Sequence, residues 1–192
     1  MKKHLRHLGL ALGLSTALSL SAQQAPSTSY VDLVNPLVGT QSDFTLSSGN
    51  TYPIISRPWG MNSWTPQTGK MGDGWQYSYQ ATKIRGFKQT HQPSPWIGDY
   101  SWLLLTPVIG KISGDTLFHR QSSYNFERAI FNPHYLRIFS ERYQIETQLS
   151  PTCYGASIQL RQTQGKNLSL YVHAADDLTL EQLDERTLSL EQ

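Results

Sequence analysis

Alternation of apolar and polar residues is the main structural signal in the second half of the chain. Residues 143–149 place Tyr, Ile, Thr and Leu on one side and Gln, Glu and Gln on the other. This period of two is what a half-buried strand requires. Residues 156–160 and 168–172 repeat the pattern, and turn-prone residues at 150–151 and 164–166 separate the three stretches. The pattern predicts successive antiparallel strands of a β-sandwich.

Two further stretches have different patterns. Residues 102–105 form a continuous apolar run, which predicts a more buried strand that Thr106 and Pro107 would end. Residues 176–192 are acidic and carry regularly spaced leucines. That last pattern fits either a strand pair or a short helix, and periodicity alone does not decide between them.

The region 32–70 is rich in Gly, Pro, Ser, Thr and Asn, so it predicts loops with short strands. Four prolines within it lie too close together for a long helix: Pro36, Pro53, Pro58 and Pro66. We therefore expect an all-β fold, an antiparallel β-sandwich over residues 30–192, preceded by a flexible leader at 23–29.

Residues 1–22 are typical of a secretion signal. Lys2, Lys3 and Arg6 precede an apolar run from Leu8 to Leu20 and small residues near Ala22. The run has about thirteen residues, whereas a spanning helix needs about 20. We expect cleavage, a secreted or periplasmic protein, and no membrane attachment afterwards.

Charge and cysteine content narrow the class of protein. Removal of the signal changes the formal net charge from +2 to 2 − 3 = −1. A nucleic-acid partner is therefore not expected, since such proteins carry a clustered basic face. Cys153 is the single cysteine, so neither an internal disulfide nor a lipid-anchor cysteine near the cleavage point is available.

The stretch 49–68 is a loop stiffened by prolines that carries Trp59 and Trp64. Either tryptophan can face a ligand, but packing in the core is the commoner role of such a residue. Trp75 lies between Gly72 and Gly74, and glycines let a chain approach a ligand closely.

The stretch 84–107 combines aromatic and polar side chains on a loop. His91, Trp96, Asp99 and Tyr100 fall within about ten positions before the predicted buried strand. A sugar site needs an aromatic face for the C–H side of the ring and a carboxylate or imidazole for its hydroxyls. The alternative is a loop in which His91 and Asp99 bond backbone groups.

Five short pieces of the chain, in this order and spacing, resemble glycoside hydrolase family 92. They are Val34-Asn35-Pro36-Leu37-Val38-Gly39-Thr40, Gly49-Asn50-Thr51-Tyr52-Pro53, Pro58-Trp59-Gly60-Met61, Gly86-Phe87 with Thr90-His91, and Gly98-Asp99-Tyr100. The stretch 132–155 is also similar to that family, so the resemblance covers roughly residues 30–160.

The resemblance implies the N-terminal domain of a calcium-dependent, inverting exo-α-mannosidase. In that family a β-sandwich packs on a C-terminal helical barrel, and the mannoside pocket lies between the two. The acid, the base and most calcium ligands belong to the barrel, and this chain ends at Gln192 before any barrel. We therefore expect neither catalytic nor metal-binding residues here, calcium only in the complete family enzyme, and mannose-containing glycans and the barrel domain as partners.

Two departures from the family pattern fall where the sandwich would touch sugar. Residues 92–96 read Gln-Pro-Ser-Pro-Trp in place of a Ser/Gly-rich stretch with a cysteine. The usual Pro-Phe-Gly-Met is Pro-Trp-Gly-Met at 58–61. Linkage preference therefore does not carry over to this chain.

Three functions remain open at this point. The first is a substrate wall of a family 92 mannosidase, inactive alone, with sugar contacts from Trp75, His91, Trp96 and Asp99. The second is a stand-alone carbohydrate-binding module. The third is a structural remnant of a truncated gene with an exposed apolar surface.

Overall fold

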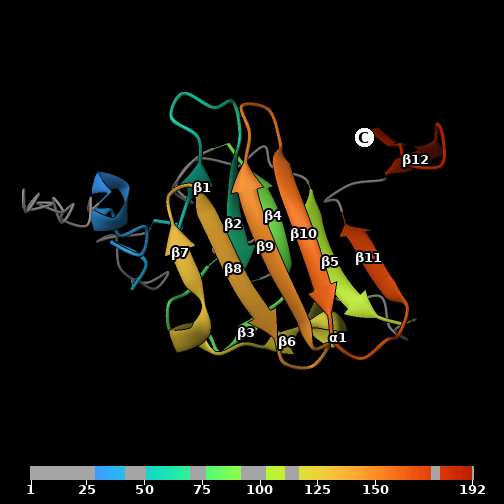
Figure 1. Cartoon of the computed structure of the whole chain (residues 1–192), viewed down its shortest axis with the longest axis horizontal. Helices are drawn as coiled ribbons and strands as arrows, with labels where there is room; N and C mark the ends of the chain where they lie inside the picture. The colour runs from blue at the N-terminus through green and yellow to red at the C-terminus, as the bar shows by residue number, and fades with distance from the viewer. Residues whose placement is uncertain are drawn as a thin grey trace, which may run out of the picture.

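The structure is a computed structural model that describes residues 29–41, 51–69, 77–91, 103–110, 117–173 and 178–191. It is a β-sandwich in which every paired strand is antiparallel (Figure 1). The expected all-β fold is confirmed. The expected signal at 1–22 and almost all of the leader at 23–29 lie outside the described residues.

Two sheets form the layers of the sandwich. The first has the order β1-β2-β4-β5-β11, and the second the order β10-β9-β8-β7. The strands of the first are β1 (Ile55–Ser56), β2 (Ser63–Gln67), β4 (Gly86–Thr90), β5 (Leu104–Ile109) and β11 (Leu168–His173). Those of the second are β7 (Ile130–Asn132), β8 (Tyr135–Ser140), β9 (Ile145–Pro151) and β10 (Ala156–Gln162).

The remaining elements are short. β3 (Lys83–Ile84) pairs with β6 (Ser122–Ser123), and β12 (Thr179–Gln182) pairs with β13 (Leu188–Glu191). The helical pieces are single turns: η1 (Tyr30–Leu33), α1 (Leu117–Arg120) and η2 (Phe126–Arg128). No helix in the described part of the chain has the length and apolarity to cross a bilayer.

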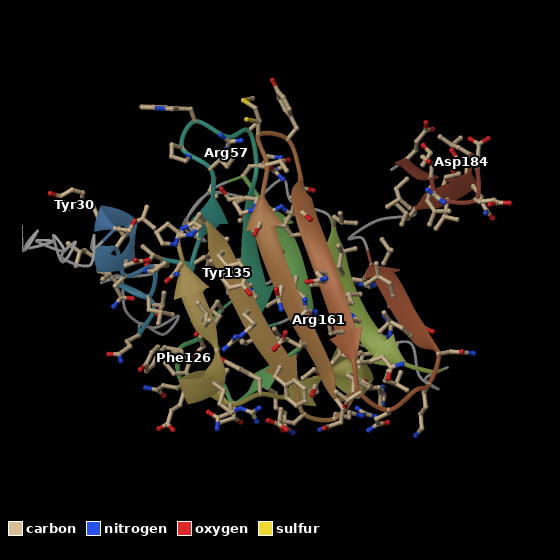
Figure 2. All side chains as sticks on the ribbon, in the orientation of Figure 1. Tyr30, Arg57, Phe126, Tyr135, Arg161 and Asp184 are labelled. Carbon is tan, nitrogen blue, oxygen red and sulfur yellow. The ribbon has the colours of Figure 1, made fainter. Side chains whose placement is uncertain are left out.

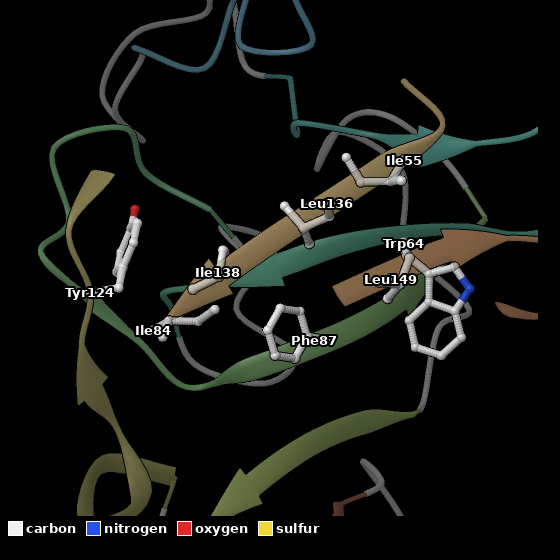
Figure 3. Packing of buried hydrophobic residues seen from close by; sticks show 8 residues of the cluster. All are labelled: Ile55, Trp64, Ile84, Phe87, Tyr124, Leu136, Ile138 and Leu149. Carbon is white, nitrogen blue, oxygen red and sulfur yellow. The ribbon is translucent and has the colours of Figure 1, made fainter. Parts of the chain in front are cut away.

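The core lies between the two large sheets (Figure 3). Ile55, Trp64 and Phe87 of the first sheet belong to one cluster with Leu136 and Leu149 of the second. A second cluster joins Val108 to Tyr143 and Ile145 near the other end of the strands. Complete burial of a Leu or Ile side chain contributes about 1.5–3 kcal/mol, so these two clusters hold the sheets face to face.

The strands predicted from alternation are confirmed. β9, β10 and β11 coincide with the three patterned stretches to within two residues at each end. Along β9 the residues alternate between buried and partly exposed, and Glu146 lies on the outer side. The open question at the C-terminus resolves as a strand pair, β12 and β13.

The prediction that Thr106 and Pro107 end the buried strand is wrong. β5 continues through both residues to Ile109, and Pro107 lies opposite Leu170 of β11. On its other side β5 pairs with β4 only at Leu104 and Leu105. Because β5 is an edge on that side at Pro107, the missing amide hydrogen costs no bond to β4.

The centre of the first sheet is buried on both faces. Thr65, Gln67, Lys88 and Thr90 are each no more than 2% exposed, although all four are polar. The side-chain amide nitrogen of Gln67 donates to the Gly69 carbonyl at 3.2 Å. Burial of both faces distinguishes β2 and β4 from strands that have solvent on one side.

Candidate functional site

Strand register brings three chain segments to one end of the sandwich. Ser63 pairs with Thr90 and also with Ser56, so the β1–β2 turn and His91 lie at the same end. The backbone amide of Met61 donates to the Cys153 carbonyl at 2.7 Å, which adds the β9–β10 turn. We call this end, made of residues 57–62, 90–91 and 152–155, the His91 edge. Arg57 marks it in Figure 2.

His91 is the one proposed sugar-contacting residue that the structure describes. It is exposed and directly follows the buried Thr90 at the end of β4. The Gln89 amide donates to the Leu103 carbonyl at 3.1 Å, so the chain returns at this same end. Trp96 and Asp99 belong to the segment between these positions and lie outside the described residues.

Trp75 also lies outside the described residues, but the chain on either side of it is well anchored. The Ser78 amide donates to the Thr68 hydroxyl at 2.8 Å, next to Gln67, which pairs with Gly86. Gln67 and Ser63 are the two ends of β2, so they lie about 13 Å apart at 3.3 Å per residue. The flanks of Trp75 and His91 are therefore not brought together.

The two tryptophans of the proline-stiffened loop have opposite environments. Trp64 is buried in the core, whereas Trp59 is 99% exposed at the tip of the β1–β2 turn. The Gly60 amide donates to the Arg57 carbonyl at 2.9 Å, and Trp59 has a φ of 60°. Proline second and a positive φ third are the features of a type II turn.

The β9–β10 turn carries further exposed side chains that the sequence reasoning did not select. Tyr154 is 81% exposed, and the thiol of Cys153 is free. The turn is closed by hydrogen bonds from the Thr152 amide to the Gly155 carbonyl and from the Gly155 amide to the Thr152 hydroxyl. Met61 of the facing turn is 67% exposed. The short stretch between two strands predicted from apolar–polar alternation was the sequence signal that could have identified Tyr154 as an exposed turn residue.

Hydrogen bonds join the family-like piece at 34–40 to Thr51, in the described part of the next piece. The Thr51 hydroxyl donates to the Val38 carbonyl at 2.7 Å, and the Thr51 amide donates to the Gly39 carbonyl at 3.2 Å. Gly39 has a φ of 81°, and a Cβ there would lie 2.5 Å from the Thr51 hydroxyl oxygen. Only glycine fits this close approach.

The described acidic residues do not form a metal site. Calcium takes six to eight oxygen ligands, and no group of three or more His, Cys, Asp or Glu side chains able to hold a metal occurs in the described ranges.

Three carboxylates lie on or beside the second sheet. Glu127 and Glu146 line a depression of about 210 Å³ together with Arg128 and Arg137. Arg128 contacts Glu141 at 3.6 Å, and the side-chain amide nitrogen of Gln148 donates to Glu146 at 2.6 Å. Glu141 is therefore paired with a cation, and Glu146 accepts a hydrogen bond from an amide.

Two other cavities lie toward the opposite end of the sandwich from His91. One of about 20 Å³ lies between the sheets beside Phe87, Thr106 and Tyr143. The other, about 350 Å³, is open and lined by Lys83, His119, Gln121, Ser123 and Arg142. Neither cavity is lined by a residue of the His91 edge.

Comparison with solved structures gives the same fold in much longer proteins. A family GH92 inverting mannosidase from Bacteroides thetaiotaomicron matches with a TM-score of 0.70 and 37% identity, over 77% of this chain and 20% of that chain. A family GH92 α-mannosidase from the same organism matches with a TM-score of 0.65 and 22% identity, over 77% and 20%. The GH92 family glycosyl hydrolase ccman5 matches with a TM-score of 0.66 and 20% identity, over 84% and 24%.

The chain thus spans about a fifth of the length of the first two solved structures. No curated protein sequence matches it. The family model described as the glycosyl hydrolase family 92 N-terminal domain matches residues 33–192. The chain belongs to glycosyl hydrolase family 92 and comprises the N-terminal domain of that family.

Proposed function

We propose that this chain is the N-terminal part of an exo-α-mannosidase, that it forms one wall of the mannoside pocket, and that it is inactive alone. The 37% identity to an inverting mannosidase supports the substrate class. The observation that supports a pocket wall is the position of His91. It is exposed at the end of the sheet where the chain leaves β4 after Thr90 and returns at Leu103.

In this proposal His91, Trp96 and Asp99 contact the terminal mannose from one side. The imidazole and the carboxylate bind hydroxyl groups, and the indole covers the C–H face of the ring. Trp75 belongs to the same proposed set, although its flanks lie at the other end of β2.

The described residues supply binding and orientation rather than proton transfer. An inverting glycosidase needs two carboxyl groups about 6.5–9.5 Å apart. In the proposal both carboxyl groups, and any calcium bound beside them, belong to a C-terminal helical barrel domain. The whole enzyme would be secreted or periplasmic, consistent with the signal-like residues 1–22.

A hydrolysis assay tests whether the chain is inactive alone. The chain is incubated with 4-nitrophenyl α-mannoside and calcium, and we expect no release of nitrophenol above the rate without protein. Measurable turnover would contradict the proposal, because the chain would then hold a working acid and base.

A binding measurement tests whether His91 belongs to a wall of the mannoside pocket. Ligand-observed NMR with methyl α-mannoside should detect weak, millimolar binding that His91→Gln abolishes. His119→Gln is the matched control, because His119 is also exposed but lies on α1 at the other end of the sandwich. Equal binding by both variants would remove His91 from the site.

A stand-alone carbohydrate-binding module is the second candidate, favoured by the exposed rings of Trp59 and Tyr154. A module binds its glycan without help from another domain. Micromolar affinity for mannan, in place of weak millimolar binding, would favour the module over the wall.

A further inference from the structure

Trp59 occupies a backbone position that tryptophan rarely adopts. It is the third residue of the turn closed by the Gly60 amide and the Arg57 carbonyl, and its φ is 60°. That position of a type II turn favours glycine or asparagine, because a side chain in the left-handed region costs about 1–2 kcal/mol. Glycine at residue 59 would close the same turn without this strain.

Packing within the chain does not offset the strain. The side chain is 99% exposed, so it contributes almost no buried area to the fold. Strained, exposed side chains of this kind are concentrated at binding sites, where a ligand supplies the missing contact. The strain and the exposure of Trp59 therefore indicate a role in ligand binding rather than in core packing.

The surroundings of Trp59 form a stiff aromatic tip. The hydrogen bond from the Met61 amide to the Cys153 carbonyl joins its turn to the one that carries Tyr154. Both rings are exposed, and Arg57 is the single charged residue within 57–62 and 152–155. Flat apolar faces on a rigid support, with few charges, are suited to the C–H face of a pyranose ring.

We propose that Trp59, on the turn that the Met61–Cys153 hydrogen bond joins to the turn of Tyr154, is an outer sugar subsite that stacks on the second or a later residue of an α-mannosidic glycan. This rests on the proposed function, in which His91 at the same sheet end contacts the terminal mannose. A protein partner fits less well, because an interface within a chain buries about 600–1,500 Å². The tip offers two rings and one methionine.

The test compares oligosaccharide with monosaccharide binding in the full chain. An α-linked mannotriose and methyl α-mannoside are titrated against wild type, Trp59→Gly and Trp59→Phe. We expect Trp59→Gly to lower the affinity for the trisaccharide about fivefold to tenfold. The affinity for methyl α-mannoside should not change, and Trp59→Phe should keep most of the trisaccharide affinity.

Stability separates this loss from misfolding. Glycine relieves the strain at residue 59, so Trp59→Gly should unfold at a higher urea concentration than wild type while it binds the trisaccharide more weakly. Tyr30→Ala is the matched control, because Tyr30 is an aromatic residue that is 87% exposed on η1, outside the tip. It should leave the trisaccharide affinity unchanged.

The outcomes distinguish this inference from the proposed function. Equal trisaccharide affinity in Trp59→Gly and wild type, with monosaccharide binding intact, would overturn the subsite and leave the wall in place. If the substitution instead abolished self-association without changing sugar affinity, the tip would be a contact between copies, which also overturns the subsite. Absence of any sugar binding by wild type would overturn both proposals.

Discussion

The backbone amide of Met61 donates a 2.7 Å hydrogen bond to the carbonyl of Cys153, and this bond joins two turns that are about 90 residues apart in sequence. One turn leads into β2 of the first sheet, and the other connects β9 to β10 of the second. The bond therefore holds the two layers together at the end that carries His91.

Met61→Pro removes the donor of this bond while the neighbouring Gly60 tolerates a following proline. We expect a loss of about 1 kcal/mol in the free energy of unfolding, the net value of one hydrogen bond. Urea unfolding measures it, and Met61→Ala, which keeps the amide, serves as the control. Equal stability of the two variants would show that the bond contributes nothing.

Gly39→Ala should destabilise the fold more than Gly165→Ala. Both glycines have positive φ, but a Cβ at Gly39 meets the Thr51 hydroxyl at 2.5 Å, whereas at Gly165 it meets nothing within 4 Å. Gly165→Ala should cost about 1–2 kcal/mol from backbone strain alone. Gly39→Ala should cost roughly 1–3 kcal/mol more from the steric contact. Matching losses in thermal unfolding would contradict the role assigned to the Gly39–Thr51 contact.

His173 should make the fold less stable in mild acid. It lies opposite Leu104, and burial, followed by the nearby Arg120 cation, lowers the pKa of its imidazole below the ordinary 6.5. At higher pH the imidazole is neutral in both states and contributes nothing. As the pH falls below 6.5 the unfolded chain takes up the proton first, so stability is lost down to the folded pKa.

His173→Gln isolates this effect. The fall in Tm between a pH of about 7.5 and a pH of about 5.5 should be smaller in the variant than in wild type. Other groups that titrate in this range are unchanged by the substitution, so they cancel in the comparison. An identical fall in both proteins would mean that His173 is not a source of the pH dependence.

The hairpin of β12 and β13 should bind hydrophobic dyes. Leu180, Leu183 and Leu188 are 54%, 58% and 55% exposed. Replacement of all three by serine should lower the fluorescence of bound dye and reduce self-association in sedimentation. The circular dichroism of the sandwich should not change. Persistent dye binding would place the apolar surface elsewhere on the chain.

The strands of the second half were predictable because they depend on local pattern. Alternation at 143–149 is enough to place Ile145 and Leu149 in the core and Glu146 outside. Pro107 was misjudged, because its effect depends on whether a neighbouring strand reaches that position. β4 does not reach it, and no local signal carries that information.

The sequence by itself determined the family, the antiparallel strands of the sandwich and the stiffness of the loop around Trp59. These follow from order, period and the restricted torsions of proline and glycine. Tertiary structure alone decided that Trp64 is buried while Trp59 is exposed, and that His91, Trp59 and Tyr154 lie at one end. The physical reason is register: pairing between strands distant in sequence sets which turns meet, and composition cannot encode it.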